Sequence, residues 1–373
     1  MASPREEQLM NVRIEGLLKE MPFYVVEFVR AKLRAGLSPA TLLDYLYDYL
    51  NFFHWLRKEG IVHMDDNVSI PFTILAELRK KDIEYYIDHL QGESIEVRAG
   101  VWKKRSDARV TRVIQSLKSL FRYLTEETED ETGECYFDRN VMAKIKTIKS
   151  KETKRHRARR ISSAILNESE ISEFINFMKW EYEHTLTPRR KAMYLRNKER
   201  DIAIISLMLG SGTRVGEIAG ITLMDIDVKK NQIDVNRKGG KTDSIHVLPS
   251  SMQDLEVYLA IRKQRYGATD KDVYVFLSKY KGQAQPLSIR AIQNNINEYT
   301  SAFTSGKSLS PHKMRHSFAT DWLRNGGSLV LLREQLGHSS IETTSLYTNL
   351  SDTDSQRIME SIDINRTGSD IEE

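Results

Sequence analysis

The sequence has little cysteine and no long hydrophobic run. Cys135 is the one cysteine among 373 residues, which excludes an internal disulfide and a cysteine-rich zinc site. Such low cysteine usage is typical of a reducing compartment. No stretch approaches the roughly 20 apolar residues of a membrane-spanning helix, and no signal-peptide pattern is evident. We therefore expect a cytoplasmic protein.

Familiar cofactor signatures are missing too. The sequence has no P-loop, no Rossmann glycine fingerprint, no metal-ligand cluster and no internal repeat. We therefore predict no cofactor and no metal. At 373 residues, the chain is long enough for two or three domains with their own cores.

A strong net charge is also lacking, because 56 Lys and Arg nearly balance 52 Asp and Glu, giving +4. The charges are nevertheless segregated. Residues 125–134 and the tail after Ser351 are acidic, whereas residues 144–160 are strongly basic. The basic run is a solvated linker, a strap on DNA phosphates, or both. Arg155 and Arg157 within it are candidate DNA contacts.

Helical periodicity dominates the first part of the chain. Residues 1–20 read as a charged helical extension, residues 21–135 as a helical bundle and residues 136–160 as the basic linker. The bundle helices are expected at residues 23–33, 39–59, 71–77, 81–91 and 106–126. The last of these has one apolar face and several cations elsewhere. These cations are either an ordinary solvated surface or DNA contacts: Arg109, Arg112 and Lys118.

The second part mixes helices with strands. Helices are predicted at 161–180, 199–210, 252–266 and 287–300, with a basic loop or helix start at 188–198. Residues 232–235 and 244–248 alternate like strands around the turn signal Gly239-Gly240, and residues 274–276 form a short apolar strand. We predict a mainly α fold with a small antiparallel sheet, a second domain over 161–350, and a C-terminal helix and acidic tail over 351–373.

Residues suited to phosphate chemistry gather between residues 309 and 347. His312 and Arg315 lie three apart in the first turn of a predicted helix, where backbone N–H groups and the helix dipole favour an anion. His338 follows an apolar segment that ends in Leu-Gly, and Tyr347 lies nine residues further on.

Two upstream segments add further candidates. Arg214 and Glu217 begin the helix predicted after Gly-Ser-Gly-Thr, where they form either a surface ion pair or part of a phosphate grip. Lys238 directly precedes the glycine pair of the hairpin. Lys241 competes with it, because a shift of three residues in the hairpin would exchange the two.

The order of these residues resembles the signature of the tyrosine recombinase (phage integrase) family. That signature is His-x-x-Arg, Leu-Gly-His and then Tyr, preceded by an Arg at a helix start and a Lys in a β-hairpin. The matching positions are Arg214, Lys238, His312, Arg315, His338 and Tyr347. The likeness covers most of residues 10–350 and is greatest for the Xer group.

The resemblance implies an N-terminal core-binding domain and a C-terminal α+β catalytic domain. It assigns Tyr347 as the nucleophile that forms a 3′-phosphotyrosine. In the same scheme, Lys238 is the general acid and His312 the general base. The transition state would be stabilised by the remaining family residues, Arg214, Arg315 and His338, with Glu217 orienting Arg214.

The resemblance also implies partners. These are double-stranded DNA with an inverted-repeat core site, a homotetramer on two duplexes joined through a four-way junction, and a septal DNA translocase of the FtsK type. Xer-type activity would resolve chromosome dimers near the replication terminus. The alternatives are an integrase of a phage, transposon or plasmid, a type IB topoisomerase, and a DNA-binding protein without catalysis.

Overall fold

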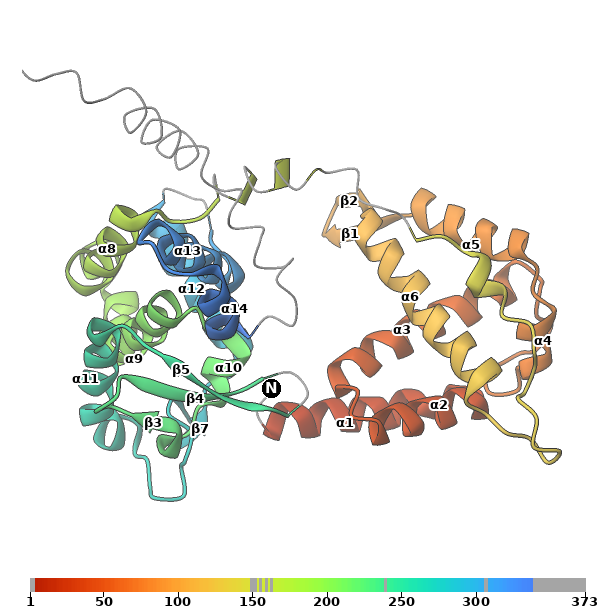
Figure 1. The fold of residues 1–373 in the computed structure, drawn as a ribbon, viewed down its shortest axis with the longest axis horizontal. Coiled ribbons are helices and arrows are strands. Elements are labelled where there is room, and N and C mark those ends of the chain that lie inside the picture. The colour runs from red at the N-terminus through yellow and green to blue at the C-terminus, as the bar shows by residue number, and fades with distance from the viewer. Residues whose placement is uncertain are drawn as a thin grey trace, which may run out of the picture. The chain divides into compact units, whose positions relative to one another are not determined.

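The computed structural model describes residues 4–147, 153, 156–157, 160–161, 164–237, 240–304 and 308–337 (Figure 1). The chain divides into two compact units, with the division between Lys151 and Glu152. In the described residues, no helix is both long and apolar enough to cross a membrane.

The first unit is a helical bundle with a short antiparallel hairpin, β1–β2. Its elements are α1 (Pro4–Leu18), α2 (Phe23–Arg34), α3 (Pro39–Lys58), α4 (Phe72–Glu77), α5 (Lys80–Gly92), β1 (Ser94–Arg98), β2 (Val101–Lys104), α6 (Asp107–Glu126) and a 3₁₀ turn, Val141–Lys144.

Local capping and an aromatic core explain this bundle. The Ser38 and Ser106 side chains accept hydrogen bonds from backbone N–H groups in the first turns of α3 and α6. Phe28 and Tyr49 are fully buried and stack edge to face at 5.8 Å. The Tyr49 hydroxyl donates to the Ser116 carbonyl at 2.8 Å, which ties α3 to α6.

The first core extends past the predicted limits of the bundle at both ends. Ile14 and Leu18 of α1 are buried in it, although residues 1–20 read as a separate extension. Val141 and Met142 are buried in the same core, although residues 136–160 read as a linker. The reason is that both segments carry apolar side chains whose removal from water outweighs the charged residues beside them.

The second unit combines helices with two small antiparallel sheets. Its elements are α8 (Glu168–Asn176), α9 (Pro188–Ser211), α10 (Val215–Gly220), β3 (Ile226–Asp227), β4 (Gln232–Asn236), β5 (Thr242–His246), α11 (Pro249–Tyr266), β6 (Leu277–Tyr280), β7 (Gln283–Pro286), α12 (Ile289–Phe303), α13 (Pro311–Arg324) and α14 (Leu329–Leu336). One sheet has the order β3-β4-β5, and β6–β7 form the other.

Helix α9 is the central support of this unit. Every residue from Arg200 to Ser211 is buried, and the helix packs against α11, α12 and α13. The β4–β5 hairpin pairs Val235 with Asp243 and turns its apolar side chains, such as Ile233, toward the core. The unit thus places the end of α9, the hairpin and α13 where their polar residues meet.

The structure decides between the two alternatives left open for residues 188–198 and corrects two other sequence-based boundaries in this unit. Residues 188–198 are the helix start and not a loop, because residues 188–211 form one continuous helix whose charged first turns are its exposed end. Val275 and Phe276 are buried and Tyr274 is half-buried, but this segment forms only an isolated bridge, Thr222 to Tyr274, and the strand begins at Leu277. The helix expected from residue 161 begins at Glu168, where the Asn167 side chain caps it.

Candidate active site

The end of α9 delivers Arg214 to the site. Gly212 ends the helix with φ +69°, a conformation that favours glycine. A Cβ at this position would lie 2.4 Å from Cδ1 of Phe318, so the position also requires the absence of a side chain. The chain then turns, and Arg214 is the N-cap residue of α10.

Glu217 fixes this arginine through two contacts. One carboxylate oxygen accepts from the Arg214 backbone N–H, and the other from its Nη1, each at 2.7 Å. The Glu217 side chain is 4% exposed, whereas the Arg214 side chain is 43% exposed. Glu217 is therefore a buried support, and the Arg214 guanidinium remains available to a ligand.

Burial alone would raise the pKa of the Glu217 carboxyl. The Arg214 N–H and the guanidinium groups of Arg237 and Arg214 outweigh burial, so the pKa lies below its usual value. Glu217 is thus an anion at neutral pH. It balances two arginines in a region that would otherwise carry excess positive charge.

Arg315 belongs to the second turn of α13. It is 1% exposed, and its Nη1 donates to the Gly212 carbonyl at 2.7 Å. Its Nη2 donates to the Leu336 carbonyl at the end of α14. The arginine therefore ties together three segments that are distant in the sequence.

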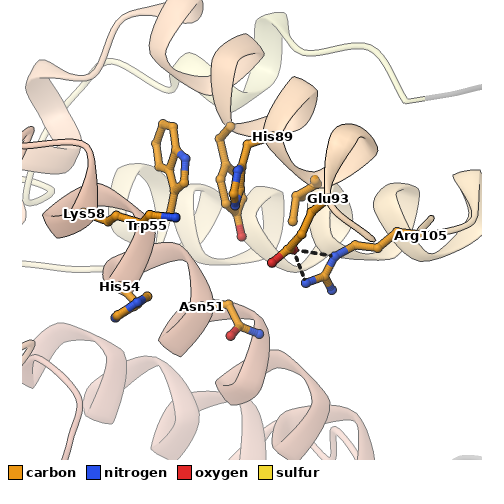
Figure 2. Close-up of a pocket in the computed structure, with 9 residues that line it drawn as sticks. Asn51, His54, Trp55, Lys58, His89, Glu93 and Arg105 are labelled. Atoms are coloured by element: carbon orange, nitrogen blue, oxygen red, sulfur yellow. Dashed lines mark hydrogen bonds and ion pairs between the residues drawn. The ribbon is translucent and has the colours of Figure 1, made fainter. Parts of the chain in front are cut away.

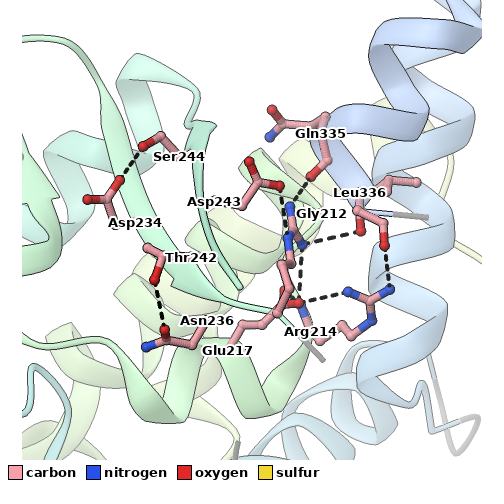
Figure 3. A network of polar contacts seen from close by, with 12 residues as sticks. Gly212, Arg214, Glu217, Asp234, Asn236, Thr242, Asp243, Ser244, Gln335 and Leu336 are labelled. Carbon is pink, nitrogen blue, oxygen red and sulfur yellow. Dashed lines mark hydrogen bonds and ion pairs between the residues drawn. The ribbon is translucent and has the colours of Figure 1, made fainter. Parts of the chain in front are cut away.

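The C-terminus of α14 is the common meeting point (Figure 3). Gly337 ends this helix with φ +61°. Arg214 Nη2 lies 3.5 Å from the Gly337 carbonyl oxygen, next to the Leu336 carbonyl that Arg315 contacts. The last carbonyls of a helix carry partial negative charge. These carbonyls therefore attract both guanidinium groups to the C-terminal end of α14.

His312 lies one turn before Arg315, with part of its side chain exposed to solvent and its ring packed on the protein. Its ring centroid is 4.3 Å from that of the buried His316. Partial burial and the nearby cations Arg315, Arg214 and Arg157 lower the pKa of the His312 imidazole. A neutral imidazole next to cations is able to accept a proton at physiological pH.

Sequence reasoning missed two buried residues of this site, Arg237 and Gln335. Arg237 contacts Glu217 and the end of α14. Gln335 donates from its amide to the carbonyls of Ser211, at 2.9 Å, and His246, at 2.7 Å. Their partners lie up to 124 positions away in the chain, so no local pattern indicated them.

Three of the six signature residues lie outside the described residues: Lys238, His338 and Tyr347. The residues directly before Lys238 and His338, which are Arg237 and Gly337, are described. The competing Lys241 is exposed, and its carbonyl accepts from the Arg237 N–H at 2.7 Å across the turn. The predicted C-terminal helix and tail over 351–373 also lie outside the described residues.

Two of the three candidate DNA contacts of the first unit, Arg109 and Arg112, have an acidic partner. Arg109 and Arg112 donate to one oxygen of Asp48 at 3.0 and 2.9 Å. The Asp48 side chain is fully buried, and burial raises its pKa to about 6 despite the opposing effect of Arg112. Both arginines remain partly exposed above it, and Lys118 is half-buried. In the basic run, Arg157 is exposed, and Arg155 lies outside the described residues.

A separate cavity of about 140 Å³ lies in the first unit between α3, α5 and the start of α6 (Figure 2). Trp55, His54 and His89 line it, and Arg105 pairs with Glu93 at its edge at 2.6 Å. None of the signature residues lines it. Across the described part of the chain, no group of three or more His, Cys, Asp or Glu residues is placed to hold a metal.

Comparisons with known proteins place this geometry in context. Residues 189–354 match the model of the phage integrase family. The chain is 37% identical over 361 residues to "Tyrosine recombinase XerS" of Streptococcus thermophilus (strain CNRZ 1066), covering 96% of this chain and 100% of that protein. It is 38% identical over 343 residues to the protein of the same name from Streptococcus gordonii, covering 92% of this chain and 96% of that protein.

Solved structures show the same fold at low sequence identity. The XerH recombinase bound to a palindromic difH substrate, in a post-cleavage complex, has a TM-score of 0.60 and 18% identity, covering 88% of this chain and 80% of that chain. The Tn1549 transposon integrase in complex with circular intermediate DNA has a TM-score of 0.55 and 18% identity, covering 91% of this chain and 99% of that chain.

Proposed function

Because the chain belongs to the tyrosine recombinases of the phage integrase family, we propose that it resolves chromosome dimers by site-specific recombination. Its substrate would be double-stranded DNA with an inverted-repeat core site, and its reaction would be strand exchange through a four-way junction. The extended identity to the XerS proteins favours this role over that of a mobile-element integrase.

The observation that supports the chemistry best is the pair of arginines at the end of α14. Arg214 and Arg315 come from different segments and contact neighbouring carbonyls. A phosphodiester under in-line attack develops negative charge on its non-bridging oxygens. Two fixed guanidinium forks meet that charge without reorganising, which is the usual source of large rate effects.

The covalent step begins with the Tyr347 hydroxyl. Its oxygen attacks phosphorus as its proton passes to His312, whose lowered pKa keeps the imidazole neutral and able to accept. The bond from phosphorus to the 5′ oxygen breaks, and Lys238 donates a proton to that oxygen. The products are a 3′-phosphotyrosine and a free 5′ hydroxyl.

The reverse step completes the exchange. A 5′ hydroxyl from the partner duplex attacks the phosphorus and gives its proton to Lys238, while the bond from phosphorus to the Tyr347 oxygen breaks and His312 returns the proton to that oxygen. The covalent intermediate keeps the energy of the broken bond, so the exchange itself consumes no nucleotide. His338 would donate a hydrogen bond to the same non-bridging oxygens in both directions.

Assembly and location complete the proposal. Four protomers on two duplexes would supply four tyrosines, and a septal DNA translocase of the FtsK type would bring the sites together in the cytoplasm. The first unit would hold the duplex through Arg109 and Arg112, which Asp48 orients from below. Lys118, Lys241, Arg155 and Arg157 would add contacts to the phosphate backbone.

A suicide substrate with a nick near the cleavage point tests this chemistry. Wild-type protein should accumulate a covalent adduct, and Tyr347→Phe should bind the same DNA with unchanged affinity but form none. The matched control is Tyr280→Phe, which changes an exposed tyrosine of β6 in the same unit and should react normally. Adducts that persist in Tyr347→Phe would show that another residue is the nucleophile.

A further inference from the structure

Arg237 is the last described residue before the turn of the β4–β5 hairpin, and its side chain points inward. The side chain is 8% exposed although arginine is normally a surface residue. Its guanidinium is therefore removed from water and depends on protein partners. These partners lie on three other segments of the unit.

The guanidinium of Arg237 makes four contacts. Its Nη2 donates to the Gln335 carbonyl at 2.7 Å, and its Nη1 to the Leu336 carbonyl at 3.2 Å. Nη1 also donates to Glu217 at 3.1 Å, and Nε to Asp243 at 3.2 Å. The residue thus joins the hairpin to the start of α10 and to the end of α14.

The fit around this guanidinium is close. A Cβ at Gly337 would lie 2.7 Å from Nε of Arg237, so a side chain there would displace the arginine. Gly337 is thus required both by its positive φ and by the approach of Arg237. Figure 3 shows Asp243, Glu217, Gln335 and Leu336 drawn together around this point.

The residues that Arg237 joins are adjacent in the sequence to two signature residues, Lys238 and His338. Arg237 directly precedes Lys238, and the carbonyls it binds belong to the two residues before Gly337, which His338 follows. A fixed Arg237 therefore limits where the lysine that follows it can reach, relative to Arg214 and the end of α14. A planar fork with several donors suits this task, and an ammonium group does not reproduce it.

We propose that Arg237 is a positioning residue for the general acid: it anchors the hairpin to the end of α14 so that Lys238 meets the leaving 5′ oxygen. This inference rests on the proposed function, in which Lys238 is that acid. It adds a residue that does not touch DNA and acts through its neighbour in the chain.

The test compares two leaving groups. One substrate has the normal 5′ oxygen at the cleavage point, and the other has a 5′-bridging sulfur, which leaves without a proton. Single-turnover cleavage at saturating protein is measured for Arg237→Lys, which keeps the charge beside Glu217, and for Arg237→Gln as a second variant. Arg324→Lys is the matched control, because it makes the same replacement at an exposed arginine in the last turn of α13, away from the contacts of Arg237.

We expect both Arg237 variants to cleave the oxygen substrate at least tenfold more slowly, since general acid catalysis contributes about 10²–10⁴-fold. The sulfur substrate should be cleaved at close to the wild-type rate, and the affinity for DNA should be unchanged. Hydrogen exchange should become faster at the Arg237 amide and across the turn, while the β4–β5 pairs stay protected. Arg324→Lys should resemble wild type in every readout.

Equal slowing of both substrates, or no slowing of either, would overturn the inference, because a purely structural role does not distinguish the leaving groups. Lys238→Ala serves as the reference. If it prefers the sulfur substrate and the Arg237 variants do not, only the role of Arg237 is wrong. If Lys238→Ala shows no preference, Lys238 is not the acid, and the proposed mechanism fails together with the inference.

Discussion

Replacing Glu217 by Gln tests whether one buried carboxylate holds the two arginines of the site. The substitution keeps the shape but removes the charge that balances Arg214 and Arg237. The Glu217 carboxylate accepts three hydrogen bonds through its two oxygens, whereas a glutamine side chain has a single acceptor oxygen. The two guanidinium groups are then left beside each other with fewer acceptors.

The expected loss of stability follows from these contacts. A hydrogen bond to a charged group contributes about 1.5–3 kcal/mol, and removing one partner of a buried ion pair costs about 3–5 kcal/mol. Because Gln retains part of the bonding, we expect the second unit to lose on the order of 2–4 kcal/mol. For a unit of this size, where 1 kcal/mol shifts the Tm by about 2–4 °C, that lowers the Tm by roughly 4–16 °C.

Thermal unfolding followed by calorimetry at several pH values is the assay. In the folded protein the pKa of Glu217 lies below the ordinary value of 4.5, so the ionised carboxylate stabilises the folded unit at higher pH. This stabilisation is lost as the pH falls through the folded-state pKa. The difference in Tm between Glu217→Gln and wild type should have its full size at pH 7 and should shrink below pH 4.5. DNA cleavage should also slow, because Arg214 loses its orientation.

The control is Asp227→Asn, which removes an exposed ion pair to Lys230 with the same spacing of three residues. It should change the free energy of unfolding by no more than about 1 kcal/mol. If Glu217→Gln has the Tm of wild type at pH 7, or if its deficit stays constant into acid, the carboxylate does not balance the arginines and the reasoning is refuted.

Three further changes test other parts of the site. Gly212→Ala should destabilise the second unit and slow cleavage, because its Cβ would overlap Phe318 at a positive φ, whereas Gly220→Ala, with nothing within 4 Å, should do neither; equal melting curves would contradict this. Arg157→Gln removes one of the cations that lower the pKa of His312, so the acidic limb of the cleavage rate at saturating DNA should move to higher pH, and an unmoved limb would argue against His312 as the base. Asp48→Asn should weaken DNA binding roughly tenfold, because Arg109 and Arg112 lose the carboxylate that holds them. Wild type should lose affinity for DNA as the pH falls through about 6, where Asp48 becomes protonated, and the variant should not. Identical pH profiles of DNA binding would show that Asp48 does not hold the two arginines.

Local signals in the sequence predicted much of this fold. The caps Ser38, Ser106 and Ser288 are short-range features, and each lies within one residue of the start of a helix predicted from the sequence. The Gly239-Gly240 signal predicted the β4–β5 hairpin, and the strands on either side of it are confirmed. These features depend on residues only a few positions apart, which is why a single sequence indicates them.

Features that depend on distant contacts were not predictable in this way. Arg237 looks like an ordinary turn cation, and only its contact with a carbonyl 98 positions away makes it a buried link. The hairpins β1–β2 and β6–β7 were also missed, because their strands are short and largely polar. Residues 274–276 resemble a strand in the sequence because buried apolar runs look alike whether or not they pair.

The pairing of Arg214 with Glu217 was predicted from the sequence, but the burial of Glu217 was not. The spacing of three residues indicated an ion pair, but it did not distinguish an exposed pair from a buried support. The distinction comes from α14, whose C-terminus covers Glu217 through Arg237. Because Glu217 is buried, its ion pair with Arg214 fixes the position of that arginine in the site.

The most direct test of the central claim is to trap the protein on DNA in its host and sequence the DNA that is attached to Tyr347. The account predicts adducts at a single chromosomal locus near the replication terminus, on a core site with inverted repeats. Adducts at the two ends of a mobile element would indicate an integrase instead. Adducts scattered over the chromosome without a shared sequence would contradict site-specific recombination.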